Sequence, residues 1–227
     1  MNRVKRTVSV VAAACLISAA AVSAQVVPVD KEPHHHVLLD TILLRVLDVN
    51  IPPGVTTLDH RHERDVATVA LEDGTTRTRT PADQDWGPTR VRARANVNIT
   101  TYTGSPGAHR VETIGTTPYH LLAVENNRAG GWLETKPMTA EGASIVQQTR
   151  AFVAYDVKLP AGTKVTNHPH EMPVVIVLMS GAVEISGNGG SEPSRLSQPG
   201  RWALIPGGHN LGVVGSSDAR VIEIEIR

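Results

Sequence analysis

The sequence has almost no cysteine and few aromatic residues. Cys15 is the single cysteine among 227 residues, so no disulfide can form within one chain. Aromatic residues make up 3% of the chain, with one phenylalanine, three tyrosines and three tryptophans. A hydrophobic core must then be packed mainly from Val, Ile, Leu and Ala. Branched side chains of this kind fill small β-barrels, so the composition favours them.

The chain also lacks an excess of charge of either sign. Its 22 Lys and Arg residues balance 22 Asp and Glu residues, so the formal net charge is zero. Nucleic acids and anionic membrane surfaces attract proteins with a net positive field. The composition gives no reason to expect such a partner, and we predict no nucleic acid binding.

Long hydrophobic runs are absent except at the N-terminus. Basic residues precede an apolar run over residues 8–21, and small residues follow as far as Ala24. This order is typical of a secretory signal peptide, cleaved after Ala24. The alternative is a membrane anchor, but the run is shorter than the roughly 20 residues that a spanning helix needs. We therefore predict a signal peptide over residues 1–24 and an exported mature chain, periplasmic or secreted, without a membrane span or a cysteine.

Histidine is present in a duplicated pattern. Residues 53–65 read PGVTTLDHRHERD and residues 160–171 read PAGTKVTNHPHE. Each copy has a Gly, five residues and then His-x-His-Glu. Val and Thr before each pair favour a β-strand, and alternate residues of a strand share one face. The two histidines of each pair are therefore predicted to point the same way.

A third histidine in each half belongs to a second repeated segment. Residues 106–109 read PGAH and residues 206–209 read PGGH, each after one of the His pairs. An isolated His-x-His pair is common without any metal role, but the repetition of both segments in one order argues against coincidence. Three imidazoles on one face can hold a divalent metal ion. The predicted ligands are His60, His62 and His109 in the first half, and His168, His170 and His209 in the second.

The pattern Gly-x5-His-x-His, followed later by Pro-Gly-His, resembles the two signature motifs of the cupins. The resemblance covers two tandem units and most of the chain after residue 24, as in a bicupin. It implies an all-β fold of two double-stranded β-helix, or jelly-roll, barrels that bind metal. We expect an N-terminal barrel over residues 25–126, a Gly- and Pro-containing linker over 127–142, and a C-terminal barrel over 143–227.

The chain departs from the family pattern where a glutamate ligand is usual. The family's first motif continues with a Glu a few residues after the second His, where this chain has Asp65 and Pro173. Glu63 and Glu171 follow their His directly, so alternation turns them to the opposite face. The expected site is therefore three histidines, without the Glu-dependent chemistry of oxalate decarboxylases. Asp65 is a candidate fourth ligand or base, and His120 is either a further ligand or a rim histidine.

Three further stretches carry polar residues whose role the pattern leaves open. The adjacent His34–His36 cannot all face one site, and a solvated turn is favoured over loose metal binding or a contact with the neighbouring barrel. Residues 91–100 alternate apolar and polar side chains, which predicts a half-buried strand. Arg92 and Arg94 of this strand are expected either to lie on a solvated face or to contact a substrate carboxylate. Residues 222–227 alternate Ile with Glu or Arg, which predicts one buried and one wet face.

Three neutral imidazoles leave the full double charge on a divalent metal. Such a site favours enolates, catecholates or carboxylates and keeps positions open for water or dioxygen. The ion can be Fe(II), Mn, Ni or Zn, because imidazole accepts all of them. Fe(II) suits oxidative ring or C–C cleavage, for which the family's three-histidine dioxygenases are the nearest precedent. The other ions suit Lewis-acid isomerisation or hydrolysis.

The sequence thus predicts a metal-binding bicupin, acting as an oxygenase on a small anionic or enolisable molecule. The alternative is a non-catalytic protein that binds a metal or a small ligand, since one scaffold hosts many functions. The sequence assigns no catalytic base. It also leaves the oligomeric state open, a homo-oligomer included.

Overall fold

The computed structural model describes residues 25–128, 136–187 and 193–227. The predicted signal peptide and residues 129–135 of the predicted linker lie outside these ranges. Within them the regular structure is almost entirely β-strand, apart from the short 3-10 helix η1 (Val29–Lys31). None of the described residues forms a helix that is long and apolar enough to cross a membrane.

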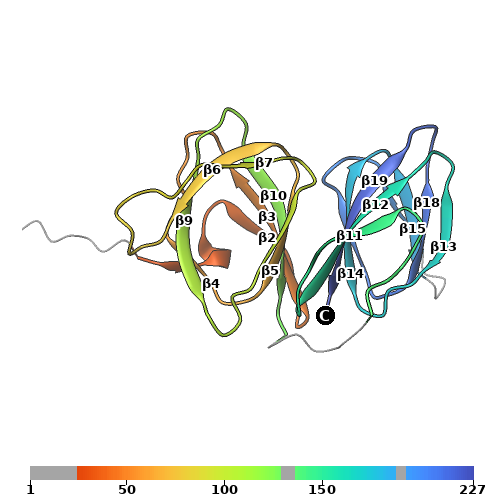
Figure 1. Cartoon of the computed structure of the whole chain (residues 1–227), viewed down its shortest axis with the longest axis horizontal. Coiled ribbons are helices and arrows are strands. Elements are labelled where there is room, and N and C mark those ends of the chain that lie inside the picture. Colours follow the sequence, from red (N-terminus) through yellow and green to blue (C-terminus); the bar gives the residue numbers. More distant parts are fainter. Residues whose placement is uncertain (1–24, 129–135, 188–192) are drawn as a thin grey trace, which may run out of the picture.

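Two five-stranded sheets close a barrel in the first half of the chain, seen from orange to green in Figure 1. One sheet has the order β1-β4-β9-β6-β7 and the other β2-β3-β10-β5-β8. Their strands are β1 (Val27–Pro28), β2 (His35–Asp40), β3 (Leu44–Ile51), β4 (His60–His62), β5 (Val66–Ala70), β6 (Gly74–Arg79), β7 (Arg90–Arg92), β8 (Val97–Thr100), β9 (Gly107–Thr113) and β10 (Tyr119–Asn126).

The second half forms another barrel from a five-stranded and a four-stranded sheet, beside the first in Figure 1. The strand orders are β11-β12-β19-β14-β17 and β13-β18-β15-β16. These strands are β11 (Ala143–Gln148), β12 (Phe152–Leu159), β13 (Lys164–His168), β14 (Val174–Ser180), β15 (Val183–Gly187), β16 (Ser194–Leu196), β17 (Trp202–Ile205), β18 (His209–Val213) and β19 (Ala219–Ile226).

The two barrels share one strand plan. β10 lies between β3 and β5, and β19 lies between β12 and β14, with antiparallel pairing throughout. β10 and β19 are each 8 residues long and pair along their whole length with another 8-residue strand, β3 or β12. Counting along each strand, Ala123 in the first barrel therefore holds the place that Glu223 holds in the second.

The barrels meet through the outer faces of their facing sheets. One buried apolar cluster contains Val46 and Val124 from the first barrel together with Phe152 and Ile224 from the second. The side chain of Gln147 on β11 also hydrogen-bonds the backbone of β8. The central strands β10 and β19 thus have one face inside a barrel and the other between the barrels.

Because of this packing, the prediction that residues 222–227 have one solvent-exposed face is wrong. Glu223 is 0% exposed, Glu225 is 1% and Arg227 is 5%. The alternation itself is as predicted, but both of its faces are buried. The isoleucines face the first barrel, and the charged residues lie on the inner side of the second.

The predicted strand over residues 91–100 is also broken. Val91 is 76% exposed at the edge of one sheet, whereas Ile99 is buried in the other. Between β7 and β8 the chain turns at Ala95, whose φ of 64° is left-handed. The period-two pattern therefore spans a corner between two sheets. Arg94 lies in that corner and donates to the carbonyl of Met179 in the second barrel.

Candidate metal centres

Strands β4 and β9 bring three of the predicted histidines together inside the first barrel. His60 lies opposite His109 in the antiparallel register, and His62, two residues along β4, shares the face of His60. One ring nitrogen from each lies within 4.8 Å of the others. The ring centroids are 4.6 to 5.1 Å apart. We call this group the first centre.

The imidazoles of the first centre are in the protonation state that metal binding needs. Burial, reinforced by neighbouring histidines, lowers the pKa of His60 to about 3, of His62 to about 2 and of His109 to about 4. All three rings are therefore neutral at pH 7. Nδ1 of His60 lies 3.0 Å from the carbonyl oxygen of Leu58, which leaves Nε2 as the free donor atom. That Nε2 and Nδ1 of His62 are buried without a hydrogen-bond partner.

A further histidine, not expected from the sequence, lies against this centre. The ring centroid of His35 is 4.6 Å from that of His60, and its Nδ1 is 2.6 Å from Oε2 of Glu32. Burial raises the pKa of Glu32, but hydrogen bonds from His35 and His34 lower it to about 2. The predicted solvated turn is thus wrong for His35, which is 8% exposed. Three adjacent histidines carry no pattern that tells which one turns inward.

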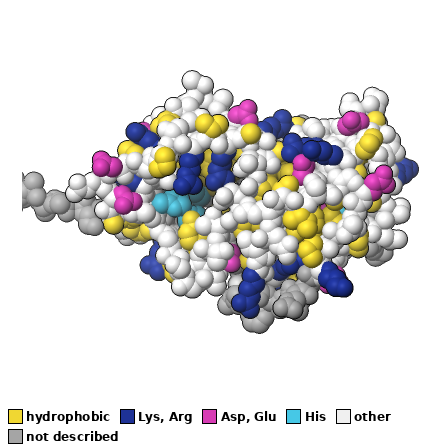
Figure 2. Space-filling view, in the orientation of Figure 1, with side chains coloured by type: hydrophobic (Ala, Val, Ile, Leu, Met, Phe, Trp, Pro, Cys, Tyr) yellow, Lys and Arg dark blue, Asp and Glu magenta, His cyan; other side chains and the backbone are white. Residues whose placement is uncertain are grey.

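A cavity of about 290 Å³ opens beside the first centre. Arg90 and Arg92 line it, and Figure 2 shows basic side chains beside a histidine patch in a hollow of the left-hand barrel. Tyr102 stacks on His62 with ring centroids 4.8 Å apart. None of the lining side chains is a carboxylate, and other polar ones come from Thr68, Thr76, Thr78, Asn98, Thr100 and Tyr119.

The structure does not bring Asp65 or His120 to the first centre. Oδ1 of Asp65 accepts two backbone N–H groups from the loop after β8, including that of Tyr102 at 2.8 Å. Asp65 therefore positions the tyrosine that stacks on His62. Nε2 of His120 lies 2.8 Å from Oδ1 of Asp48. Alternate residues of β10 point to opposite faces. Ala123 faces the barrel interior, so His120 faces outward.

The second barrel brings its three histidines together with a glutamate that the sequence analysis missed. His168 lies opposite His209 in the register, His170 follows the end of β13, and the ring centroids are 5.0 to 5.4 Å apart. Glu223 projects among them from β19. Its Oε2 is 3.0 Å from Nε2 of His170, and its Oε1 is 3.3 Å from Nε2 of His209. We call this group the second centre.

The buried carboxylate makes the second centre electrostatically unlike the first. Burial lowers the pKa of His170, but hydrogen bonds to Glu223 and Glu225 raise it to about 9. Burial raises the pKa of Glu223, but the hydrogen bond from His170 and the nearby ring of His209 lower it to about 2. His168 has a pKa lowered by burial to about 4. Without metal, this centre therefore holds a buried carboxylate paired with a protonated His170, whereas the first centre has three neutral rings.

Larger side chains fill the second barrel at positions that line the cavity of the first. A buried aliphatic cluster with one tyrosine occupies its interior. The strand register matches three pairs of positions at which the side chain differs between the barrels. Thr68, Leu47 and Ala123 in the first barrel correspond to Ile176, Tyr155 and Glu223 in the second. The first centre therefore faces a cavity, and the second is enclosed.

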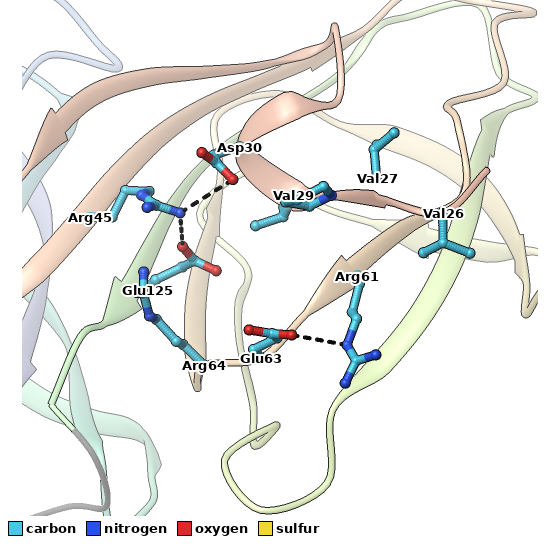
Figure 3. A pocket seen from close by; sticks show the side chains of 10 residues that line it. Val26, Val27, Val29, Asp30, Arg45, Arg61, Glu63, Arg64 and Glu125 are labelled. Carbon is cyan, nitrogen blue, oxygen red and sulfur yellow. Dashed lines mark hydrogen bonds and ion pairs between the residues drawn. The ribbon is translucent and has the colours of Figure 1, made fainter.

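A separate pocket of about 240 Å³ lies beside β1 at the surface of the first barrel (Figure 3). Nη1 of Arg45 is 3.2 Å from Oε2 of Glu125 and 3.8 Å from Oδ1 of Asp30. Arg61 and Glu63 form a second ion pair, at 3.1 Å. None of the described histidines lines this pocket, so it is separate from both centres.

The chain matches no protein-family model and no curated protein. Solved structures share its fold. AerE from Microcystis aeruginosa is 16% identical, with a TM-score of 0.65 over 88% of this chain and 96% of that one. A cupin 2 conserved barrel domain protein from Leptotrichia buccalis is 9% identical, with a TM-score of 0.55 over 85% and 88%.

Salicylate 1,2-dioxygenase from Pseudoaminobacter salicylatoxidans, in adducts with gentisate, is 12% identical, with a TM-score of 0.59 over 82% of this chain and 69% of that one. At such identities the similarity shows the fold alone. The predicted fold class, all-β jelly-roll barrels of the cupin type, is confirmed.

Proposed function

We propose that this protein is an exported, metal-dependent oxygenase whose first centre acts on a small anionic or enolisable molecule. The observation that carries the proposal is the placement of three neutral histidines, two buried and one half-buried, at the wall of a cavity that also holds two arginines. Export to the periplasm or the medium belongs to the proposal and depends on the predicted signal peptide over residues 1–24.

The donor set of the first centre fits a divalent ion. His60, His62 and His109 are neutral and converge, and two of their ring nitrogens are buried without a partner. A buried polar atom without a partner costs about 1–3 kcal/mol, which ligation of that atom would remove. Three imidazoles accept Fe(II), Mn, Ni or Zn. Bound Fe(II) would supply the one-electron chemistry that reaction with dioxygen requires.

The chain's own residues would bind and orient the substrate. Arg90 and Arg92 offer charge-assisted hydrogen bonds to a carboxylate or enolate in the cavity. Nη1 of Arg92 is 3.4 Å from Oγ1 of Thr68, and its guanidinium lies 6.0 Å from the ring centroid of Tyr119. These contacts hold the cation at the cavity wall. Apolar side chains from β3 and β10 line the same cavity and would exclude water from the substrate.

The similar dioxygenase suggests which compounds to test first. Its structure holds gentisate, and its name gives salicylate as substrate. Both are small aromatic hydroxy acids, which combine a carboxylate for the arginines with oxygens for a metal. Catechols, β-diketones and flavonols offer the same bidentate oxygens without the carboxylate, so the two groups separate the role of the arginines from that of the metal.

The test combines metal analysis with oxygen uptake. The purified mature protein would be analysed for bound metal, reconstituted with Fe(II) and offered these compounds in an oxygen electrode. We expect His62→Ala to lose about one metal equivalent and the oxygen uptake, because a three-ligand site cannot spare a donor. His36→Ala is the matched control, since His36 is exposed on the adjoining strand. Unchanged metal content in His62→Ala would refute the assignment.

One observation favours the alternative, a non-catalytic protein that binds a metal or a small ligand. None of the side chains that line the cavity is a carboxylate, so a general base of that kind is missing next to the first centre. Bound zinc, ligand binding and no oxygen uptake with any compound would establish the binding protein instead.

A further inference from the structure

We infer that the second centre is a closed metal site in which Glu223 joins the histidines as a protein ligand, and that its role is to hold the two sheets of the second barrel together. This inference concerns a different centre from the proposed oxygenase site and goes beyond it. The six histidines were predicted as ligands, but the glutamate and the structural role come from the fold.

One donor atom each from His168, His170 and Glu223 lies within 4.8 Å of the others. The carboxylate oxygens of Glu223 lie 3.0 Å from Nε2 of His170, 3.3 Å from Nε2 of His209 and 3.6 Å from Nδ1 of His168. Zinc binds such nitrogens and oxygens at about 2.0–2.2 Å, so neighbouring donors around one ion are about 3.0–3.5 Å apart. His168, His170 and Glu223 therefore form a donor group for one ion, and His209 lies against the same carboxylate.

Unpartnered atoms in this centre show that an internal ion pair does not complete it. The side chains of His168, His209 and Glu223 are 0% exposed. Both ring nitrogens of His168, Nε2 of His209 and Oε1 of Glu223 are buried without a hydrogen-bond partner. The ion pair between Glu223 and His170 satisfies one carboxylate oxygen. The other oxygen approaches His209 and His168 at 3.3 and 3.6 Å without forming a hydrogen bond to either. A shared cation would pair with atoms of all three residues.

The surroundings of His170 are those of a metal ligand. Its Nδ1 lies 2.7 Å from Oε2 of Glu225, and Oε1 of Glu225 lies 3.3 Å from Nε of Arg227. A carboxylate behind a ligating histidine fixes the ring and makes it a better donor. In the first barrel Glu125 holds the place of Glu225, but it pairs with Arg45 instead.

The position of Glu223 gives the ion a structural role. The inner face of β19 carries Glu223, and its outer face packs against the first barrel through Ile222 and Ile224. An ion that joins β19 to the histidines of β13 and β18 would connect the two sheets of the second barrel. The donors are buried and aliphatic side chains fill the interior around them, as in a closed structural site and not an open catalytic one.

The test measures metal stoichiometry and thermal unfolding on the whole mature protein. Protein stripped with a chelator would be titrated with Zn(II) or Co(II), and bound metal counted by mass spectrometry. We expect two equivalents for the wild type and one for His62→Ala. Glu223→Gln should bind its second equivalent much more weakly, because three histidines remain without the carboxylate. Glu184→Gln, an exposed glutamate of the same barrel, is the control and should bind two.

The melting temperature assigns each ion its role. Metal should raise it by several degrees in the wild type and in His62→Ala, and should have little effect in Glu223→Gln. A wild type that binds one equivalent, lost in His62→Ala, would overturn the inference, as would an unchanged affinity for the second equivalent in Glu223→Gln. Should Glu223→Gln fail to fold, ¹⁵N spectra of the wild-type rings on zinc addition decide, because His168 and His209 must shift.

These outcomes separate the two proposals. Loss of oxygen uptake in His62→Ala concerns the first centre alone. Loss of the stabilising ion in Glu223→Gln concerns the second alone.

Discussion

Ala123→Glu should convert the first centre into a copy of the second. Ala123 lines the cavity beside the three histidines, and its register position is that of Glu223. The new carboxylate should therefore come within about 3 Å of His62 and His109, as Glu223 does of His170 and His209. In metal-free protein, the pKa of His62 should rise from about 2 toward the value of about 9 found for His170.

The size of the effect on ligand binding follows from charge. A buried carboxylate beside an anionic ligand costs several kcal/mol, and every 1.4 kcal/mol is tenfold in affinity. We expect at least about a 100-fold loss of affinity for an anionic substrate analogue. Metal affinity should increase, because the site gains a charged donor. In the metal-free variant, the new His–Glu pair should stabilise the fold below pH 6.5, and this gain should fade as the pH rises through the new pKa of His62.

The assay is a proton NMR titration of the histidine rings, followed by calorimetric titration of the metal-loaded protein with salicylate. Ala123→Gln is the matched control, since it has the same size and no charge. Ala123→Gln should leave the pKa of His62 low, and it should weaken salicylate binding only because the larger side chain reduces the volume of the cavity. If Ala123→Glu and Ala123→Gln gave the same titration and the same affinity, the matched registers of β10 and β19 would not describe the two centres.

Three further predictions follow from particular contacts. Arg92→Met should weaken binding of a carboxylate substrate about 10- to 100-fold, because a charge-assisted hydrogen bond is worth about 1.5–3 kcal/mol; equal losses for neutral catechols, measured as KM, would contradict it. Hydrogen bonds from Arg110 lower the pKa of the buried Asp59, so their contribution is complete above the ordinary value of 3.8 and disappears as the pH falls through the lowered pKa. Asp59→Asn should therefore cost about 1.5–3 kcal/mol at pH 7 and less at pH 3, as measured by urea unfolding; an equal cost at both values would count against the ion pair. Phe152→Ala should cost about 3–5 kcal/mol, since the side chain is 0% exposed between the barrels, and a loss under about 1 kcal/mol in the same assay would show that the interface adapts.

Local pattern sufficed where the chemistry lies within a few residues of one strand. The spacing of His60 and His62 placed both rings on one face, and the structure has them there. The same rule turned Glu63 and Glu171 outward, and both are exposed. The duplication of the histidine segments predicted two barrels with a histidine cluster each, and each barrel has one.

The pattern was insufficient where burial depends on residues far along the chain. The alternation over residues 222–227 predicted two faces, but a strand pattern contains no information on what covers each face. Only the packing of the first barrel on β19 buries the isoleucines, and only closure of the second barrel buries Glu223. His35 is a similar case, because its burial depends on contacts with Glu32 and His60.

The sequence by itself determined the fold class, the repeat and the histidine clusters, because strand alternation and ligand spacing are properties of short segments. The tertiary structure alone decided that the two centres differ. Ala123 and Glu223 are 100 positions apart in the sequence and occupy equivalent places only through the pairing of β10 and β19 with their neighbours. That pairing gives one centre a cavity and the other a buried carboxylate.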